Sequence, residues 1–375
     1  MYSDIIEANT ILKSNITDNA ASHTKITYFG ASGEIGRNVL SSLIDRIPNG
    51  KTTIVLFAHS TANLIKLDGL AKELQQKVEL LEKDIVIKYT NNSMETAGSD
   101  VILCSTDVKP SQEMNALESI PSKVIRSFAN KESIENIARI AKEYSPKSAF
   151  VVATNQTDLV AQIAREAAPG LKVFGLTGMV DSTRLRNEYY AKTRVKLDSG
   201  LIVGLHNLDQ KDYTMFPVES SLHAFDNSII DMDSLAFANS QIKGLGGQIA
   251  KKLSTDRPPE FGIGPHILPG AGFVQFVMSY CYGEKTLVES WNRKIETSED
   301  ALFWDLQIGA QLSLPMVINK DSITPCFAFL PNEKEKAMLK QALAEIDLAY
   351  EQMKSINILK AKIGKKDLDQ SLPPM

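Results

Sequence analysis

A glycine-rich turn between two apolar segments constrains the fold of this chain more than any other feature. Residues 26–29 (Ile-Thr-Tyr-Phe) are short and β-prone, and residues 30–36 follow directly as Gly-Ala-Ser-Gly-Glu-Ile-Gly. Apolar side chains then recur at helical spacing between residues 35 and 47, before Pro-Asn-Gly breaks the helix. An apolar run at residues 53–57 comes next. This order predicts strand, turn, helix and strand, the unit from which parallel sheets are built.

The alternation of apolar runs and helical segments continues to about residue 177. The predicted helices lie at residues 64–81, 130–144 and 158–167, and further strands at residues 85–87, 101–104, 149–153 and 173–175. The runs are apolar throughout, as expected of parallel strands that helices cover on both faces. We therefore predict a Rossmann-type α/β fold, a doubly wound parallel sheet, over residues 25–177.

The pattern changes after residue 178. A helix is predicted at residues 181–192, followed by a β-rich stretch and by long helical segments around residues 236–253 and 333–353. This mixture predicts an α+β C-terminal domain over residues 178–375. Residues 1–24 form a polar N-terminal extension.

The position of the glycine turn predicts a dinucleotide site. The first glycine allows a tight turn, the second lets the backbone approach a pyrophosphate, and the third lets helix and strand pack closely. Free N–H groups at the helix N-terminus favour the phosphates. A turn without a ligand is the simpler interpretation, but all three glycines fall where a dinucleotide needs them. The residues expected to bind the cofactor are Gly30, Ser32, Gly33, Glu34, Ile35 and Gly36.

The end of the second strand leaves the choice between NAD and NADP open. An acidic residue roughly twenty positions after the glycine turn usually binds the adenosine ribose. Here the strand ends as Phe-Ala-His-Ser, and no Asp or Glu occurs between Arg46 and Leu67. An uncharged pocket repels a 2′-phosphate less, and His59 or Ser60 is placed to contact one. The simpler interpretation of His59 is a histidine in a surface loop. We expect NAD, with NADP as the alternative.

Composition excludes several classes of protein. The 375 residues carry a net charge of -4, which does not indicate the basic surface that nucleic-acid binding needs. Cys104, Cys281 and Cys326 are far apart, so no disulfide framework and no metal site is predicted, and a reducing compartment is favoured. No apolar run has the length of a membrane span, and the first 25 residues lack the apolar core of a signal peptide. We expect a cytoplasmic protein without nucleic-acid or membrane partners.

Several further segments occur in an order that resembles the lactate/malate dehydrogenase family. They are residues 154–158 (Thr-Asn-Gln-Thr-Asp), 176–186 (Leu-Thr-Gly-Met-Val-Asp-Ser-Thr-Arg-Leu-Arg), 203–206 (Val-Gly-Leu-His), 270–273 (Gly-Ala-Gly-Phe) and 314–318 (Leu-Pro-Met-Val-Ile). The second is the most specific, because the family has Leu-Asp-x-x-Arg-x-Arg there. The resemblance covers roughly residues 25–355. It implies an NAD(P)-dependent oxidoreductase that acts on a small 2-hydroxy/2-oxo acid and assembles as a homodimer or homotetramer.

The resemblance also implies a set of site residues. His206 resembles the catalytic histidine that exchanges the hydroxyl proton, a task that suits its near-neutral pKa. Asp181 resembles the aspartate that orients this histidine, and Arg184 the arginine whose guanidinium clamps the substrate carboxylate. Asn155 resembles the asparagine near the nicotinamide and the substrate oxygen. Taken singly, these residues would be a structural histidine, a helix N-cap, a solvated helix arginine and a turn former.

The chain departs from the family pattern at three places. Val108 stands where malate enzymes have arginine and lactate enzymes usually have glutamine, and Arg126 is the best substitute for a substrate-binding arginine. An exposed arginine at a helix start is an equally good interpretation of Arg126. Gln156 replaces the proline whose peptide bond is cis in the lactate enzymes. Because a cis bond before a non-proline residue costs about 3 kcal/mol, we expect this turn to be rebuilt. Finally, Asn207 replaces a glycine.

Three hypotheses for the function follow. The first is a dehydrogenase for malate/oxaloacetate, with lactate/pyruvate or a larger apolar 2-oxo acid second. The missing loop arginine motivates the next, a non-catalytic NAD(P)-binding relative with a regulatory role. A weaker alternative is an NAD- and metal-dependent glycosidase of a related fold, which would need cysteine and histidine ligands near the nicotinamide. Cys104 is the only cysteine in that region.

Overall fold

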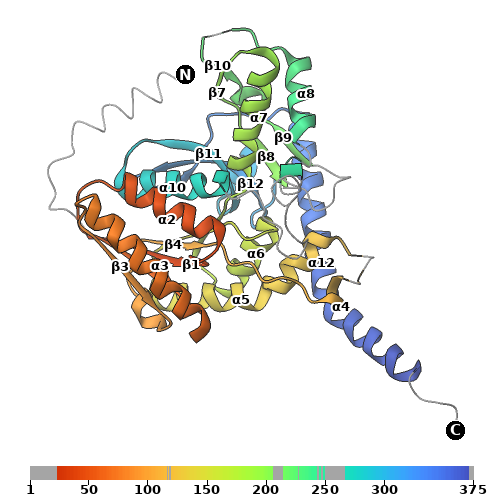
Figure 1. Ribbon diagram of the computed structural model, residues 1–375. Coiled ribbons are helices and arrows are strands. Elements are labelled where there is room, and N and C mark those ends of the chain that lie inside the picture. The colour runs from red at the N-terminus through yellow and green to blue at the C-terminus, as the bar shows by residue number, and fades with distance from the viewer. Residues whose placement is uncertain are drawn as a thin grey trace.

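The computed structural model of the protein is shown in Figure 1. It describes residues 23–115, 117, 120–205, 214–226, 228–242, 245, 248–249 and 267–370. One large mixed sheet runs through both halves of the described chain, and a separate two-stranded antiparallel sheet lies in the C-terminal half. Helices cover both faces of the large sheet, and smaller elements extend one end.

The first half of the sheet is parallel. Its strands are β1 (Thr24–Phe29), β2 (Thr52–Phe57), β3 (Ile85–Thr90), β4 (Val101–Cys104), β5 (Ala149–Val152) and β6 (Lys172–Gly175), in the spatial order β3-β2-β1-β4-β5-β6. Every residue of β2, β4 and β5 is buried, which explains why these runs are apolar without alternation. The strand order reverses on either side of β1, so the predicted doubly wound, Rossmann-type sheet is confirmed.

Helices on the two faces of the sheet form two separate apolar cores. The elements between the parallel strands are α2 (Glu34–Arg46), α3 (Thr61–Leu80), η2 (Ser93–Thr96), α4 (Gln112–Asn115), α5 (Ser122–Tyr144) and α6 (Thr157–Ala167). One core lies between the sheet and α2 and α3, and the other between the sheet and α5 and α6. Helix α5 begins at Ser122, eight residues before the predicted start, because Val124 and Ile125 are buried and Pro121 leads into the first turn.

The second half of the chain continues the same sheet with antiparallel strands. These are β8 (Ile202–Leu205), β9 (Thr214–Pro217), β11 (Leu287–Lys294), β12 (Gln311–Asn319) and β13 (Ser322–Pro325). Strand β11 meets β6 where Asn292 pairs with Gly175. A Cβ on Gly175 would lie 2.8 Å from the Asn292 Cβ, so the glycine permits this contact. The mixed α+β character of this half agrees with the sequence, and the division at residues 177/178 stays a prediction.

The remaining elements pack around these strands. They are α7 (Gly178–Thr193), β7 (Leu197–Ser199), η3 (Glu219–Ser221), β10 (His223–Ala224), α8 (Met232–Ile242), α10 (Ile267–Tyr282), α11 (Ser298–Trp304) and α12 (Glu333–Gln370). Helix α10 packs against α2 and was not predicted, because it is apolar on almost every side and shows no helical stripe. Helix α12 was predicted to residue 353 but extends to Gln370, and its end projects from the rest of the chain (Figure 1).

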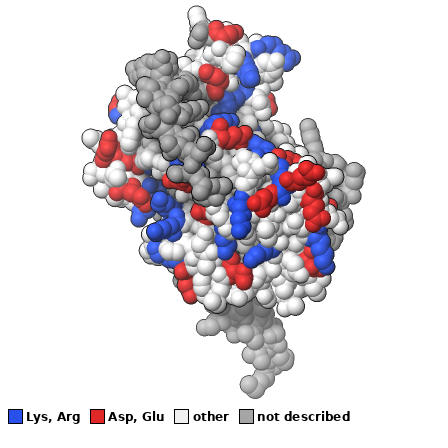
Figure 2. Space-filling view, turned by 90° about the vertical axis from the view of Figure 1, so that its left-hand side faces the viewer, with Lys and Arg blue, Asp and Glu red and all other residues white. Residues whose placement is uncertain are grey.

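The surface carries charges of both signs. Figure 2 shows Lys and Arg interspersed with Asp and Glu over the described part of one face. None of the helices within the described residues has the length and apolar character needed to cross a membrane.

Candidate functional site

The glycine turn joins β1 to α2 at the carboxyl edge of the parallel sheet. Gly30 has a φ of +89°, and a Cβ there would lie 2.8 Å from the backbone of Ser105 and Thr106. A Cβ on Gly36 would lie 2.4 Å from the carbonyl oxygen of Ala31. The first glycine therefore supplies a tight turn, and the third allows helix and strand to pack closely, as the sequence indicated.

The middle glycine leaves the start of α2 open. Gly33 is the N-cap residue, so no side chain caps the helix, and its own N–H donates to Gly30 O (3.1 Å). The first-turn N–H groups of a helix carry a partial positive charge and bind phosphates well. This backbone cradle fits the pyrophosphate of a dinucleotide, which would lie against Ser32 and Glu34.

Replacing Gly36 by alanine is expected to lower the free energy of unfolding by about 3 kcal/mol, since backbone atoms cannot move away from the new methyl group. NADH affinity should fall with it, because the turn must shift. The matched control is Gly69→Ala in α3, where nothing lies within 4 Å of the new Cβ. That change should stabilise the protein by about 0.5–1 kcal/mol. Denaturant titration and NADH fluorescence measure both; equal behaviour of the two variants would contradict the close packing.

The strand ends next to the glycine turn are tied together. Gly30 lies against Thr106, and the hydroxyl of Thr154 donates to Thr106 O (2.7 Å). Asn155 follows at once and is exposed at the carboxyl edge of the sheet. Ligands of doubly wound sheets bind at this edge. The position of Asn155 therefore suits contact with a bound cofactor or substrate.

The turn after Asn155 corrects one expectation. The Asn155–Gln156 peptide bond is cis, so the prediction that this turn is rebuilt was wrong. Gln156 is completely buried, its backbone N–H donates to Ser127 Oγ (3.3 Å), and its side chain donates to Asp158 Oδ2 (3.3 Å). The conformation of this turn therefore involves a contact with the distant Ser127, which the local sequence around Gln156 does not indicate.

Two of the expected site residues form a buried ion pair on α7. The guanidinium of Arg184 donates from Nη1 to Asp181 Oδ1 (2.9 Å), and the two residues are 8% and 1% exposed. Thr177, not Asp181, is the N-cap of α7. The interpretations of Arg184 as solvated and of Asp181 as an N-cap are therefore wrong. Among the described residues, Arg184 Nε is buried without a hydrogen-bond partner. A buried N–H of this kind calls for an acceptor, such as a carboxylate ligand.

His206 lies outside the described residues. The strand that precedes it, β8, packs beside α7, and the backbone N–H of Ile202 donates to Ser182 Oγ (2.8 Å). Ser182 is the residue next to Asp181. The structure therefore joins the strand before His206 to the helix that carries the Asp181–Arg184 pair.

Arg126 lies beside the segment that follows β4. It pairs with Asp107 Oδ2 (3.1 Å), and both side chains are partly exposed, at 38% and 45%. The backbone of Val108 is held on both sides by the buried Asn130, which accepts from its N–H (2.8 Å) and donates to its carbonyl (3.3 Å). Arg126 thus lies next to the segment after β4, where the sequence suggested a substrate-binding arginine. Its ion pair with Asp107 is solvent-exposed.

A cavity of about 350 Å³ opens at the end of β2. His59 lies on its wall, with its ring 5.9 Å from that of Phe29 and 5.6 Å from that of Phe57. Desolvation lowers the pKa of His59 below its usual value and so favours the neutral form of the ring. The lining residues are Phe57, Ala58, His59, Asn91, Asn136, Arg139, Ile140 and Glu143. No acidic side chain of β2 itself reaches this cavity.

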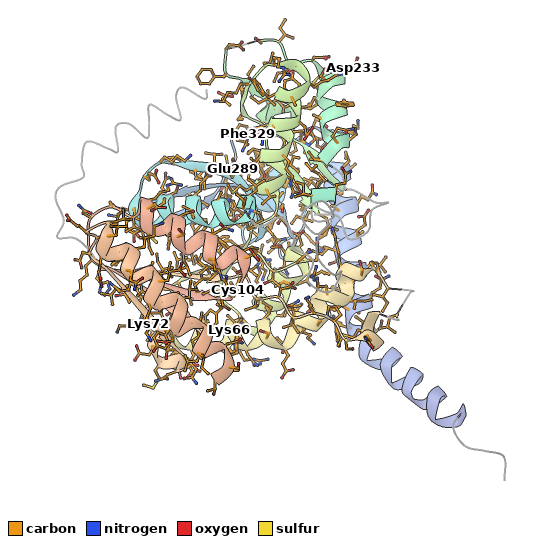
Figure 3. All side chains as sticks on the ribbon, viewed as in Figure 1. Lys66, Lys72, Cys104, Asp233, Glu289 and Phe329 are labelled. Atoms are coloured by element: carbon orange, nitrogen blue, oxygen red, sulfur yellow. The ribbon has the colours of Figure 1, made fainter. Side chains whose placement is uncertain are left out.

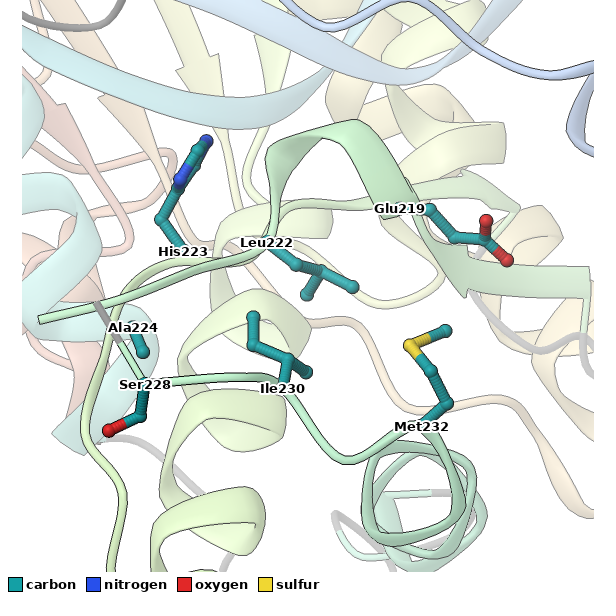
Figure 4. Close-up of a pocket in the computed structure, with 7 residues that line it drawn as sticks. All are labelled: Glu219, Leu222, His223, Ala224, Ser228, Ile230 and Met232. Carbon is teal, nitrogen blue, oxygen red and sulfur yellow. The ribbon is translucent and has the colours of Figure 1, made fainter. Parts of the chain in front are cut away.

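A second cavity, of about 360 Å³, lies in the C-terminal half. Leu222, Ile230 and Met232 converge on it (Figure 4). The other lining residues are Glu219, His223, Ala224 and Ser228. None of the residues expected to bind cofactor or substrate lines this cavity.

Cys104, the candidate ligand of the metal-dependent alternative, is completely buried at the end of β4 (Figure 3). Its Sγ contacts Thr106 Oγ1 at 3.5 Å. Within the described part of the chain, no three or more His, Cys, Asp or Glu side chains are grouped to hold a metal ion.

Sequence reasoning missed a buried polar cluster behind Asn155, made of Asp158, Thr177 and Asn292. An aspartate in the first turn of a helix is ordinary, so Asp158 drew no attention. The only signal was its inclusion in the segment 154–158 that carries the resemblance.

Several malate dehydrogenases are similar to this chain in sequence. No protein-family model matches the chain. A malate dehydrogenase of Desulforudis audaxviator is 25% identical over 264 residues, which cover 69% of this chain and 74% of that protein. A malate dehydrogenase of Bacteroides fragilis is 24% identical over 304 residues, 78% of this chain and 88% of that protein.

Solved structures share the fold. The malate dehydrogenase of Plasmodium falciparum superposes with a TM-score of 0.70 at 16% identity, covering 89% of this chain and 99% of that one. The lactate dehydrogenase of Cryptosporidium parvum gives 0.67 at 19% identity, with 88% and 98% covered. The order of the sequence motifs, the strand order of the sheet and these similar proteins all point to the same kind of dehydrogenase. The chain is similar to malate dehydrogenases in sequence, and it shares the fold of malate and lactate dehydrogenases.

Proposed function

We propose that the protein transfers a hydride between NAD(P) and a small 2-hydroxy/2-oxo acid, with malate/oxaloacetate as the first candidate pair. The observation that supports this most is the Asp181–Arg184 pair. Its guanidinium is buried and keeps Nε without a partner among the described residues, which suits a carboxylate ligand. The relatives named malate dehydrogenase favour malate over lactate.

The cofactor would lie along the carboxyl edge of the sheet. Residues 30–36 would hold its pyrophosphate, and Asn155 would lie near the nicotinamide, which accepts or donates the hydride when bound. The fit rests on the glycine turn, where side chains at the first and third glycines would collide with backbone.

Each remaining residue has a role in moving or holding charge. His206 would take the hydroxyl proton as the 2-hydroxy acid is oxidised, and return it to the 2-oxo acid in reverse. Asp181 would hold the imidazole in one orientation and stabilise its protonated form. Arg184 would bind the substrate carboxylate, and Arg126 would act on the far side of the substrate if it left its ion pair with Asp107.

We infer NAD as the cofactor, with NADP tolerated because no carboxylate stands at the end of β2. His59→Asp should place an acceptor where it can bind a ribose 2′-hydroxyl and repel a 2′-phosphate. We expect the ratio of kcat/KM for NADH to that for NADPH to rise at least about tenfold, the size of one lost or gained polar contact. His59→Asn is the control without charge. An unchanged ratio in His59→Asp would show that the cavity lined by His59 does not bind the adenosine ribose.

The assay that tests the proposal follows absorbance at the reduced-nicotinamide band. The purified protein is mixed with oxaloacetate, pyruvate, or branched or aromatic 2-oxo acids, with NADH and then NADPH. Turnover of one acid would support the dehydrogenase and identify its substrate. Silence across the panel, with NADH still bound, would favour the second candidate, a non-catalytic relative. The exposed Arg126–Asp107 pair, in place of a loop arginine, is the observation behind that candidate.

Two further properties belong to the same proposal. A homodimer or homotetramer is inferred from the family and is measured by light scattering. A cytoplasmic location is favoured by the three cysteines, which are all free and buried in the structure.

A further inference from the structure

A buried carboxylate lies directly behind the candidate site. Asp158, in the first turn of α6, is completely buried. Its Oδ1 accepts hydrogen bonds from Thr177 Oγ1 (3.3 Å) and Asn292 Nδ2 (2.6 Å), and its Oδ2 accepts from Gln156 Nε2 (3.3 Å). These donors come from three segments that lie far apart in the sequence. One carboxylate therefore connects the turn before α6, the start of α7 and strand β11.

The partly buried guanidinium of Arg165 lies close to this carboxylate, and the Asn292 amide bonds to both groups. Asn292 accepts from Arg165 Nη1 (2.8 Å), which also donates to Gln311 Oε1 (2.6 Å). Nη2 of Arg165 donates to the carbonyls of Val173 and Asn292. Desolvation lowers the pKa of Arg165 to about 9, and the charge of Asp158 acts against this. The cluster is thus well bonded, and an uncompensated charge within it would be costly.

The carboxylate is bonded to both segments that carry substrate-site residues. Gln156 directly follows Asn155. Thr177 begins α7, and its carbonyl accepts from the N–H of Asp181 (3.4 Å). Gln156 and Thr177 both donate to the Asp158 carboxylate. These two hydrogen bonds therefore set the position of the neighbouring Asn155 relative to Asp181 without a direct contact between them.

We propose that Asp158 is a positioning residue, which fixes the Asn155–Gln156 turn relative to the first turn of α7 and so sets the spacing between the cofactor side and the substrate side of the site. This rests on the proposed function, since the segments it joins are those assigned to cofactor and substrate. Reacting groups must be placed closely, and a displacement of about 1 Å can cost about a hundredfold in rate.

The competing explanation is that Asp158 serves stability alone, and the chain offers a matched control. Asp300 is another buried aspartate, and both of its carboxylate oxygens accept from Arg293. Arg293 is the neighbour of Asn292 on β11, so its side chain points to the opposite face of the strand. Asp300 joins β11 to α11 instead of to the candidate site. Loss of either carboxylate leaves a guanidinium less compensated, that of the partly buried Arg165 or that of the buried Arg293.

The first experiment compares Asp158→Asn with Asp300→Asn in the full chain. Both should lower the melting temperature. For Asp158→Asn we expect kcat/KM for the 2-oxo acid to fall at least about tenfold, mostly through KM, while the NADH dissociation constant stays within about twofold, because only placement of the substrate groups is lost. Asp300→Asn should keep kcat/KM within about twofold. Equal kinetic changes in the two variants would overturn the proposal.

A milder pair covers the case in which Asp158→Asn does not fold. Thr177→Val removes a hydroxyl that donates to Asp158 and accepts from Ser313 Oγ (2.9 Å), and it leaves every charge in place. Thr177→Ser keeps the hydroxyl. We expect Thr177→Val to raise KM about fivefold, in line with the lost hydrogen bond to Asp158, and Thr177→Ser to keep the wild-type value. Wild-type kinetics in Thr177→Val would overturn the proposal.

Hydrogen exchange gives a readout that needs no turnover. The amides of residues 155–158 and 178–184 should exchange faster in Asp158→Asn and Thr177→Val, but not in Asp300→Asn or Thr177→Ser. If the wild-type protein turns over no acid in the panel, the proposed function fails, while exchange still decides whether Asp158 holds the two segments. Unchanged exchange in both test variants would reject positioning even in an active enzyme.

Discussion

Replacing Arg184 by lysine is expected to lower kcat/KM for the 2-oxo acid by about a hundredfold or more, since an ammonium cannot bind a carboxylate through two parallel hydrogen bonds. Most of the change should appear in KM. The charge next to Asp181 is kept, so the fold should survive. Steady-state kinetics with a varied acid, at saturating NADH, measures the effect.

The same helix supplies a control. Arg186 donates to the buried Glu289 (2.8 Å), two residues after Arg184, and this charge opposes the desolvation that raises the pKa of Glu289. Arg186→Lys should lower the melting temperature and keep KM within about twofold, because its partner belongs to the protein and not to the substrate. If Arg186→Lys raised KM as much as Arg184→Lys, the assignment of Arg184 as the residue that binds the substrate carboxylate would be wrong.

Replacing His206 by asparagine should reduce kcat by about a thousandfold or more, near the upper range of what general acid/base catalysis contributes. Asparagine keeps a polar side chain but cannot exchange a proton near neutral pH. The NADH dissociation constant, measured by fluorescence, should stay within about twofold of wild type. Stopped-flow absorbance then reports the hydride step.

His223 offers a matched histidine for comparison. It is exposed on β10 and lines the cavity in the C-terminal half. His223→Asn should leave kcat near the wild-type value, since that cavity contains none of the expected site residues. Full turnover in His206→Asn would show that another group exchanges the proton.

The parallel half of the fold was predictable because the burial of each strand is visible in its own residues. Strands β2, β4 and β5 are buried on both faces, so their sequences are short apolar runs that need no knowledge of the neighbours. Helix α10 shows the opposite case. Its burial on almost every side removes the apolar stripe, and only packing against α2 shows that it is a helix.

The candidate site divides in the same way. The glycine turn and the three-residue spacing of Asp181 and Arg184 are local, so the sequence displays them. The burial of that pair depends on how α7 packs, which no local pattern contains. The contact between Asp158 and Asn292 joins residues 134 positions apart, and the geometry of the turn at Gln156 involves the distant Ser127. Sequence patterns do not reach such distances.

The pairing of β6 with β11 has a consequence for how the protein responds to its ligands. Since one sheet passes through both halves, and buried polar side chains cross the junction, we expect the two halves to unfold together. A dinucleotide held at the glycine turn would therefore protect the far strands as well. Thermal unfolding would remain a single transition, and its midpoint would rise with the cofactor concentration. Cofactor binding would then raise the free energy of unfolding of the C-terminal half as well as that of the parallel half.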